Sequence, residues 1–258
     1  MELLHTEILG SGEPMVLING LGRTGQHWLG FDQELAKYYK LFVPDNRGLG
    51  NSHKMWADKG MSVNQMAQDI VDLLDAHKID SAHVVGLSLG GMISLELGSK
   101  FAERVKSLTI INSSVGGTLR PRISIAAVVG LMTSAVARRE MFDRSFDFLI
   151  GGAEERRQDI ITEWQRIARD MKIPARVINR QLLAAIKYKG DGIESIKAPT
   201  FVIMSSDDKF VPPGNSKVIA KRIKNSVLKN FPIGGHEITV ARPVELSASI
   251  NELICTSI

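Results

Sequence analysis

The residues best suited to chemistry are a serine between glycines and, further along the chain, an aspartate pair and a histidine. The serine lies in Gly86-Leu87-Ser88-Leu89-Gly90-Gly91. A serine hydroxyl is a weak nucleophile unless a nearby base accepts its proton. A sharp strand-to-helix turn exposes such a hydroxyl, and only small residues two before and two after it permit the turn. The pattern alone is common by chance, but here an apolar strand precedes it and a helical stretch follows.

Among the six histidines, His236 is the best candidate for the base. It follows Gly234-Gly235 directly after the last predicted strand, in a loop that can reach back over the sheet. The other five have structural interpretations, in strands, at a helix end or in loops: His5, His83, His77, His27 and His53. A loop histidine considered alone is more often a solvated side chain, so the prediction depends on its combination with Ser88.

Two aspartates are candidates for the acid that orients the histidine. Ser205-Ser206-Asp207-Asp208 follows a predicted strand over 200–204. The carboxyl ends of strands are where open α/β sheets place their chemistry, although either aspartate could simply cap a turn. The chain order serine, aspartate, histidine is the one expected for a triad built on such a turn.

The elements that must position these side chains alternate between strands and helices. Apolar runs predict strands, and helical spacing predicts the stretches between them. The predicted strands are 6–9, 15–18, 41–43, 83–86, 108–111, 200–204 and 227–231. The predicted helices are 28–38, 92–101, 216–223 and 245–254. A further helix is predicted to begin at a capping box formed by Ser62 and Gln65. This alternation predicts an α/β domain with a mostly parallel, twisted sheet and helices on both faces.

The alternation stops after Val115, and the chain reads as helical only until about Ser195. The predicted helices there are 123–136, 141–149, 159–171 and 175–187, separated at Pro121, Gly151-Gly152 and Pro174. We therefore predict a core domain formed by residues 1–114 and 196–258, with an all-helical cap over 115–195.

Composition excludes several classes of protein. The 258 residues are 44% hydrophobic and 23% charged, which is ordinary globular usage and not that of a disordered chain. No membrane span or secretion signal is expected, and a single cysteine, Cys255, favours a reduced cytoplasmic protein. The net charge of +4 comes from the 115–195 segment, which holds 14 basic and 10 acidic residues. Without an aromatic platform, this charge does not predict nucleic-acid binding.

Together these features resemble the α/β-hydrolase fold family over nearly the whole chain. Further matching motifs are Asn19-Gly20-Leu21-Gly22, Asp45-Asn46-Arg47-Gly48-Leu49-Gly50-Asn51-Ser52 and Gly235-His236. In such proteins the acid loop reads Gly-x-x-Asp-x-x-x-Pro, and aligning Pro212 favours Asp208 over Asp207. The resemblance also implies an oxyanion hole formed by the backbone N–H groups of Leu21 and Leu89. One departure is Asn19, where many relatives carry histidine.

The resemblance implies a serine hydrolase that cleaves carboxylic esters, with Ser88, Asp208 and His236 as its catalytic residues. It requires no metal or organic cofactor. The main alternative is a methyl ester esterase acting on a pimeloyl acyl carrier protein, which the chain resembles in size, cap and charge. Carbon–carbon hydrolysis, enol-lactone hydrolysis and perhydrolysis stay open, as does a receptor that keeps the fold to bind a small ligand without turnover.

The cap is expected to cover the site and to supply an apolar pocket. We expect substrate contacts from Gly20, Leu87, Phe142 and Phe146, although most apolar cap residues should form the cap's own core. Cap arginines could bind an acidic carrier protein or a carboxylated substrate: Arg138, Arg139, Arg156 and Arg157. The simpler interpretation is a solvated helical surface on which they pair with Glu154, Glu155 and Asp159.

Overall fold

The computed structural model describes residues 2–55, 61–116 and 140–257. The strands are β1 (Thr6–Leu9), β2 (Pro14–Ile18), β3 (Lys40–Pro44), β4 (Ala82–Leu87), β5 (Val105–Ile111), β6 (Thr200–Ser205) and β7 (Ser226–Phe231). The helices are α1 (Phe31–Leu35), α2 (Val63–Ala76), α3 (Leu89–Lys100), α5 (Glu140–Leu149), α6 (Arg157–Asp170), α7 (Ala175–Lys187), α8 (Gly214–Arg222), α9 (Ile238–Ala241) and α10 (Pro243–Thr256). Short 3-10 turns lie at Gly25–Trp28, Gly50–Ser52, Ala102–Arg104, Glu154–Arg156 and Ile193–Ser195.

The strands form one sheet in the order β1-β3-β2-β4-β5-β6-β7. The β1 strand runs antiparallel to β3, and every other neighbouring pair is parallel. Because parallel strands end at the same edge, the loops after β2, β4, β5, β6 and β7 all leave the sheet on one side. The predicted α/β fold with a mostly parallel sheet is confirmed.

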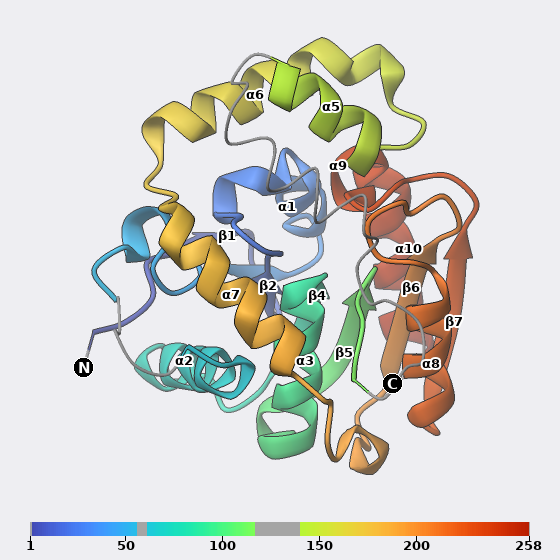
Figure 1. Cartoon of the computed structure of the whole chain (residues 1–258). Helices are drawn as coiled ribbons and strands as arrows, with labels where there is room; N and C mark the ends of the chain where they lie inside the picture. Colours follow the sequence, from blue (N-terminus) through green and yellow to red (C-terminus); the bar gives the residue numbers. More distant parts are fainter. Residues whose placement is uncertain (1, 56–60, 117–139, 258) are drawn as a thin grey trace.

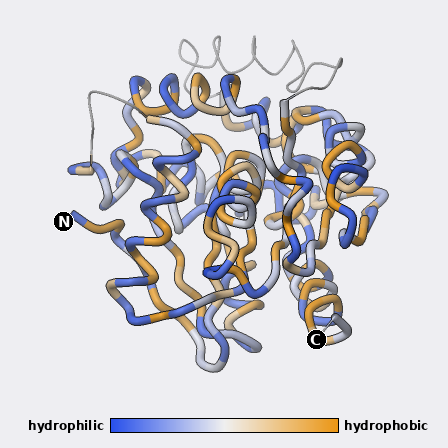
Figure 2. Tube along the Cα trace, turned by 90° about the horizontal axis from the view of Figure 1, so that it is seen from below, coloured by the Kyte–Doolittle hydropathy of each residue, from blue (hydrophilic) through white to orange (hydrophobic). Residues whose placement is uncertain are grey.

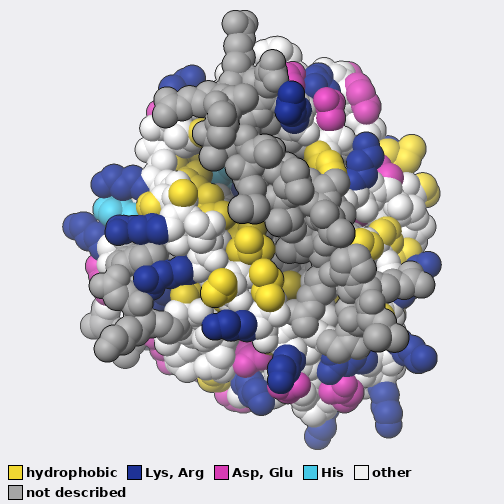
Figure 3. Space-filling model, viewed as in Figure 1, with side chains coloured by type: hydrophobic (Ala, Val, Ile, Leu, Met, Phe, Trp, Pro, Cys, Tyr) yellow, Lys and Arg dark blue, Asp and Glu magenta, His cyan; other side chains and the backbone are white. Residues whose placement is uncertain are grey.

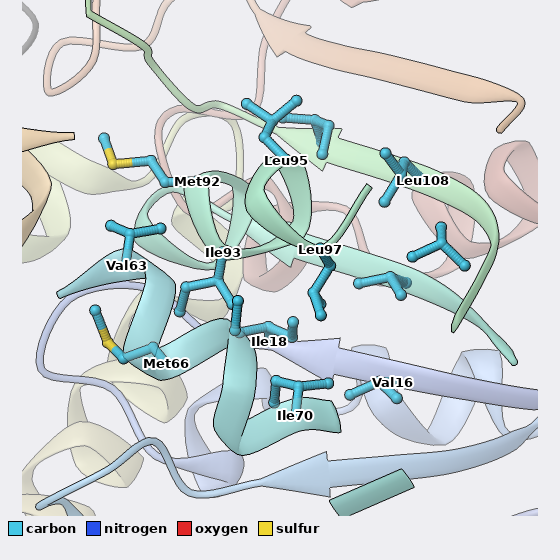
Figure 4. Close-up of a cluster of buried hydrophobic side chains, with 14 of the residues drawn as sticks. Val16, Ile18, Val63, Met66, Ile70, Met92, Ile93, Leu95, Leu97 and Leu108 are labelled. Carbon is cyan, nitrogen blue, oxygen red and sulfur yellow. The ribbon is translucent and has the colours of Figure 1, made fainter. Parts of the chain in front are cut away.

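Successive strand residues face opposite sides of the sheet, and each side has its own hydrophobic cluster. One cluster joins Val16, Val84 and Leu108 to helices α2, α3 and α8. Figure 4 shows part of it, with Met66 and Ile70 packed near Ile18 and Ile93. The other cluster packs the intervening strand residues against α1 and α10. Along the helices, hydrophobic and hydrophilic residues alternate, as Figure 2 shows, which is the pattern of helices that cover a sheet.

Between β5 and β6 the described chain is helical, as predicted for the cap. The helices α5 and α6 lie beyond the ends of the strands, and α7 crosses in front of α3 and β4 (Figure 1). Helix α7 spans the predicted 175–187, whereas the predicted helix 123–136 and the arginines at 138 and 139 lie outside the described residues. None of the described helices combines the length and hydrophobicity needed to cross a bilayer.

The helix predicted over 28–38 is wrong in detail. A 3-10 turn ends at Trp28, and α1 begins only at Phe31. Leu29 and Gly30, with φ of 46° and 99°, separate them. This break lets the rings of Trp28 and Phe31 both be buried, with their centroids 5.6 Å apart. Burial of two large rings outweighs the helical spacing. At α2, by contrast, one half of the predicted capping box is present: the Ser62 hydroxyl accepts a hydrogen bond from the Gln65 N–H at 3.1 Å, while the Gln65 side chain donates to Asp69 at 3.3 Å.

The packing of α3 generates a stability prediction at Gly90. A Cβ there would overlap the Ile18 carbonyl oxygen, a backbone atom that cannot move aside. We expect Gly90→Ala to lower the free energy of unfolding by about 1–3 kcal/mol, as overpacking of a core does. The matched control is Gly98→Ala in the same helix, where the nearest atom is the flexible Leu108 Cδ1 at 2.6 Å. Denaturant titration of both variants measures the difference, and equal losses would contradict this account.

Candidate active site

Ser88 lies at the turn between β4 and α3 in a backbone conformation that L-residues rarely adopt. Its φ and ψ are 55° and −113°, and the residue is only 9% exposed. Holding a non-glycine residue there costs about 1–3 kcal/mol, which the surrounding structure must supply. A Cβ at Gly86 would overlap the Gly90 carbonyl, so both glycines of the motif are required for the close approach of strand and helix.

The predicted oxyanion residues lie beside Ser88. A Cβ built on Gly20 would be 3.4 Å from the Ser88 Cβ, so the loop after β2 passes directly over the nucleophile. No described residue accepts a hydrogen bond from the Leu21 N–H. Leu89 is the first residue of α3, where backbone N–H groups have no acceptor within the helix. These two donors are therefore available for a negatively charged oxygen that develops next to Ser88.

Asn19 holds the oxyanion loop in shape. Its amide nitrogen donates to the Thr24 carbonyl at 3.0 Å, and its side-chain oxygen accepts from the Gly20 N–H at 2.8 Å. The Asn46 side chain in turn donates to the Asn19 carbonyl at 3.0 Å. A histidine side chain has no carbonyl oxygen with which to repeat this pattern. The asparagine at this position therefore has its own structural role.

The structure brings His236 and Asp208 together as a buried pair. The His236 Nδ1 lies 2.8 Å from Asp208 Oδ2, and both residues are at most 6% exposed. The other oxygen, Asp208 Oδ1, accepts from the backbone N–H groups of Phe210 and Val211, both at 2.8 Å. The Phe210 ring also covers the imidazole, with centroids 4.7 Å apart. The carboxylate is thus fixed in place, and Nε2 of the imidazole is the nitrogen left for other chemistry.

Burial and charge act on His236 in opposite directions. Burial lowers the pKa of His236, while the charge and hydrogen bond of Asp208 raise it by more, so the net shift is upward from 6.5. Glu237 also raises this pKa, and Arg23 lowers it. The Arg23 guanidinium is itself 3.0 Å from Glu237 and lies over the Trp164 ring of the cap. An imidazole that can take up and release a proton suits general acid–base catalysis.

Asp207 has a different role from Asp208. Its Oδ1 accepts from the backbone N–H groups of Gly234 and Gly235 at 3.0 and 2.9 Å, so it shapes the turn that leads to His236. Gly151 of the cap lies against the same carboxylate and against Gly235, where any Cβ would overlap them. From the sequence, only the family pattern favoured Asp208 over Asp207 as the acid. In the structure the contacts of the two residues distinguish them directly.

Sequence reasoning missed Asn112, which links the acid and base loops. Its Nδ2 donates to the Gly235 and His236 carbonyls, both at 2.9 Å, and its Oδ1 accepts from the Ser205 N–H at 2.9 Å. The next residue, Ser113, donates its hydroxyl to the Ser88 carbonyl at 2.7 Å. An available signal was a run of polar residues, Asn112-Ser113-Ser114, directly after the buried strand β5.

No hydrogen bond joins the Ser88 hydroxyl and the His236 ring within the described chain. Two consecutive residues connect their backbones. Asn112 donates a hydrogen bond to the His236 carbonyl, and Ser113 donates one to the Ser88 carbonyl. Hydrogen bonds between nucleophile and base often tighten only when substrate is bound. The described arrangement is therefore a hydrogen-bonded Asp208–His236 pair and a Ser88 turn, both held by the segment that follows β5.

Two of the predicted substrate contacts are almost fully buried. Leu87 and Phe146 are each 1% exposed and are packed in hydrophobic clusters, Leu87 with the α1 side of the sheet and Phe146 with the cap core. Both side chains belong to hydrophobic clusters, and their part in substrate binding stays a prediction. Phe142 is half-buried at the edge of the cap cluster, and Gly20 lies against Ser88. Both stay predictions.

Two of the four cap arginines named above, Arg156 and Arg157, are described, and both have partners within this chain other than those expected. Arg156 donates to the Val240 carbonyl at 2.8 Å. Arg157 pairs with Asp143 and Asp147 rather than with the acidic residues beside it in sequence. Figure 3 shows basic side chains spread around this face and hydrophobic ones gathered near its middle. The contacts reduce the basic surface that a carrier protein could use.

Comparison with known proteins shows the family to which the chain belongs. A family model described as "alpha/beta hydrolase fold" matches residues 13–148, slightly more than half of the chain. Two similar proteins are both named "Putative carbamate hydrolase RutD". The one from Caulobacter strain K31 is 29% identical over 92% of this chain and 89% of its own length. The one from Variovorax paradoxus is 28% identical over 97% and 96%.

Solved structures show the same fold. An enol-lactonase from Burkholderia xenovorans has a TM-score of 0.81 at 20% identity, covering 98% of this chain and 96% of its own. An esterase from Exiguobacterium antarcticum has a TM-score of 0.83 at 19% identity, covering 98% and 95%. At these identities the likeness is one of fold alone. The family match and the relatives together support a hydrolase of this fold.

The Asp208–His236 pair generates a prediction about turnover and its pH dependence. A general base works only when neutral, so activity falls as pH drops through its pKa, and the acidic limb of kcat/KM should lie above 6.5. Asp208→Asn should lower kcat by about 10³–10⁴-fold. It should also move that limb to lower pH, because the charge of Asp208 no longer offsets the lowering of the His236 pKa by burial. Asp207→Asn is the matched control, since an amide oxygen can still accept from both glycines. The reverse ranking of the two variants would refute the assignment.

The contacts of Asn112 generate a second prediction. Asn112→Asp keeps an acceptor for the Ser205 N–H but loses both donors to the histidine loop. Displacing a catalytic group by about 1 Å can cost about 10²-fold in rate, so we expect kcat to fall by that order with little change in KM. The rate at which a fluorophosphonate modifies Ser88 should fall in parallel. If the variant has a lower melting temperature but a wild-type kcat at temperatures where it is folded, Asn112 only stabilises the fold.

Proposed function

Because the chain belongs to the α/β-hydrolase fold family, we propose that it is a serine hydrolase that cleaves carboxylic esters through an acyl-enzyme on Ser88. The observation that supports this most is the buried 2.8 Å contact between His236 and Asp208 beside the Ser88 turn. A histidine held at Nδ1 by a carboxylate is oriented to accept a proton at Nε2. The constrained φ of Ser88 keeps its hydroxyl at the turn, where a base can reach it.

The proposed reaction has two halves. The Ser88 oxygen attacks the carbonyl carbon, His236 accepts the hydroxyl proton, and the Leu21 and Leu89 N–H groups stabilise the tetrahedral oxyanion. The bond to the leaving alcohol then breaks, and the alcohol takes the proton from His236. In the second half, water attacks the acyl-enzyme and gives His236 a proton, which returns to Ser88 as the carboxylic acid leaves. Every proton is carried by one imidazole.

A second candidate is hydrolysis of a carbamate. Proteins named as putative carbamate hydrolases match more than nine-tenths of this chain. The same machinery would act on such a substrate, because a carbamate also presents a carbonyl carbon to Ser88 and forms an oxyanion on attack. Its acyl-enzyme would be a carbamoyl group, which is less electrophilic than an alkyl acyl group because nitrogen donates electron density to the carbonyl. Deacylation would then be the slower half.

The test is to label the protein with a fluorophosphonate and to assay p-nitrophenyl esters of increasing acyl length beside phenyl carbamate. We expect the label on Ser88, and Ser88→Ala should lower kcat by roughly 10⁴-fold or more. Ser99→Ala at the other end of α3 is the matched control. Faster turnover of phenyl carbamate than of all the esters would favour the second candidate.

A label on another residue, or activity that survives Ser88→Ala, would refute the proposal. Tight binding of a small ligand with neither labelling nor hydrolysis would instead favour a receptor. A rate enhancement specific to methyl esters carried on an acyl carrier protein would favour the carrier esterase.

A further inference from the structure

A polar residue, Gln181, lies on the buried face of the cap helix α7. It is 0% exposed, and the other buried residues of the helix interior are Val177, Ala184 and Ala185. At this spacing all four lie on one side of the helix, the side that faces the core. An apolar residue would ordinarily occupy such a position, because burying an amide costs free energy unless its hydrogen bonds are made.

One half of the Gln181 amide is bound to the proposed oxyanion loop. Its Oε1 accepts a hydrogen bond from the Gly22 N–H at 2.9 Å, and Gly22 follows Leu21 in the chain. The α7 residues Ala184 and Ala185 belong to the same hydrophobic cluster as Leu89, and Leu21 packs against that cluster. The carboxamide is therefore hydrogen-bonded to the same loop whose Gly20 lies against Ser88.

The other half of the amide is unpaired. Gln181 Nε2 is buried and has no hydrogen-bond acceptor in the part of the chain that the structure describes. Exchanging the oxygen and nitrogen would not relieve this, because an NH₂ group would then face the Gly22 N–H, donor against donor. Most buried donors in native proteins have a partner, and this unpaired donor belongs to a side chain bound to the loop over Ser88, where a ligand atom can supply the acceptor.

We propose that Gln181 Nε2 donates a hydrogen bond to an oxygen atom of the substrate's acyl group, close to the carbonyl that Ser88 attacks. Gln181 is then a specificity-determining residue, and the favoured substrates carry a hydrogen-bond acceptor, such as an ether or carbonyl oxygen, near the scissile bond. This inference rests on the proposed function. It adds the polarity of the acyl group, which neither the fold nor the triad determines.

The experiment compares two p-nitrophenyl esters of equal size, the methoxyacetate and the butyrate, which differ by an ether oxygen in place of a methylene. The readout is the ratio of their kcat/KM values in the wild type and in two variants. Gln181→Met removes both halves of the amide in a side chain of similar length. Gln181→Glu, measured on the alkaline plateau of activity, keeps an acceptor for Gly22 but has no donor. Using the change in the ratio cancels the different intrinsic reactivities of the esters.

We expect the ratio to fall roughly three- to tenfold in both variants, the effect of one neutral hydrogen bond. If turnover of both esters falls and the ratio is unchanged, Gln181 only holds the loop and the inference is wrong. It is also wrong if only Gln181→Met changes the ratio, since loop position would then set the preference. If one variant fails to fold, as judged by thermal unfolding, the other decides. Absence of all hydrolysis and of Ser88 labelling in the wild type would instead refute the proposed function.

Discussion

The close approach of β4, α3 and the end of β2 is the constraint on which the rest of the structure depends. At Gly86 and Gly90 the neighbouring backbone leaves no room for a Cβ, and the Ile18 carbonyl lies against Gly90. Only with this contact can α3 begin immediately after Ser88. The same contact brings the loop after β2 over the serine, so the proposed nucleophile and both proposed oxyanion donors depend on one packing arrangement. A methyl group at Gly86 or Gly90 would push α3 away from the strands and separate Ser88 from the loop after β2.

The second layer of organisation is polar and lies just beyond the strands. Because β5 is between β4 and β6 in the sheet, residues that follow it can reach both neighbours. From this position Asn112 and Ser113 bind the His236 carbonyl, the Ser205 N–H and the Ser88 carbonyl. The groups are buried, so each hydrogen bond is stronger than it would be in water and an unmade one is more costly. This explains how three distant segments keep one geometry.

The cap contacts the core at the loops that carry the chemistry. Segment 149–151 lies against the histidine loop, where Leu149 accepts from the Glu237 N–H and Ile150 pairs with Gly235. Arg23 joins the loop after β2 to Glu237 and to Trp164 of α6. With Gln181 on Gly22, these contacts make the cap part of the support of the site and not only its cover. Substitutions in the cap can therefore change turnover as well as substrate preference.

The sequence by itself determined the alternation of strands and helices, the helical insertion after β5, and the serine turn, because these depend on local periodicity and on glycines at fixed spacing. It also ranked His236 first and, through the family pattern, Asp208. Only the tertiary structure showed what Asp207 does, that Asn112 connects the loops, that Leu87 and Phe146 are packed away, and that Gln181 is buried with one donor unpaired. These depend on contacts between residues far apart along the chain. Local pattern carries no information about which distant backbone groups will need a partner.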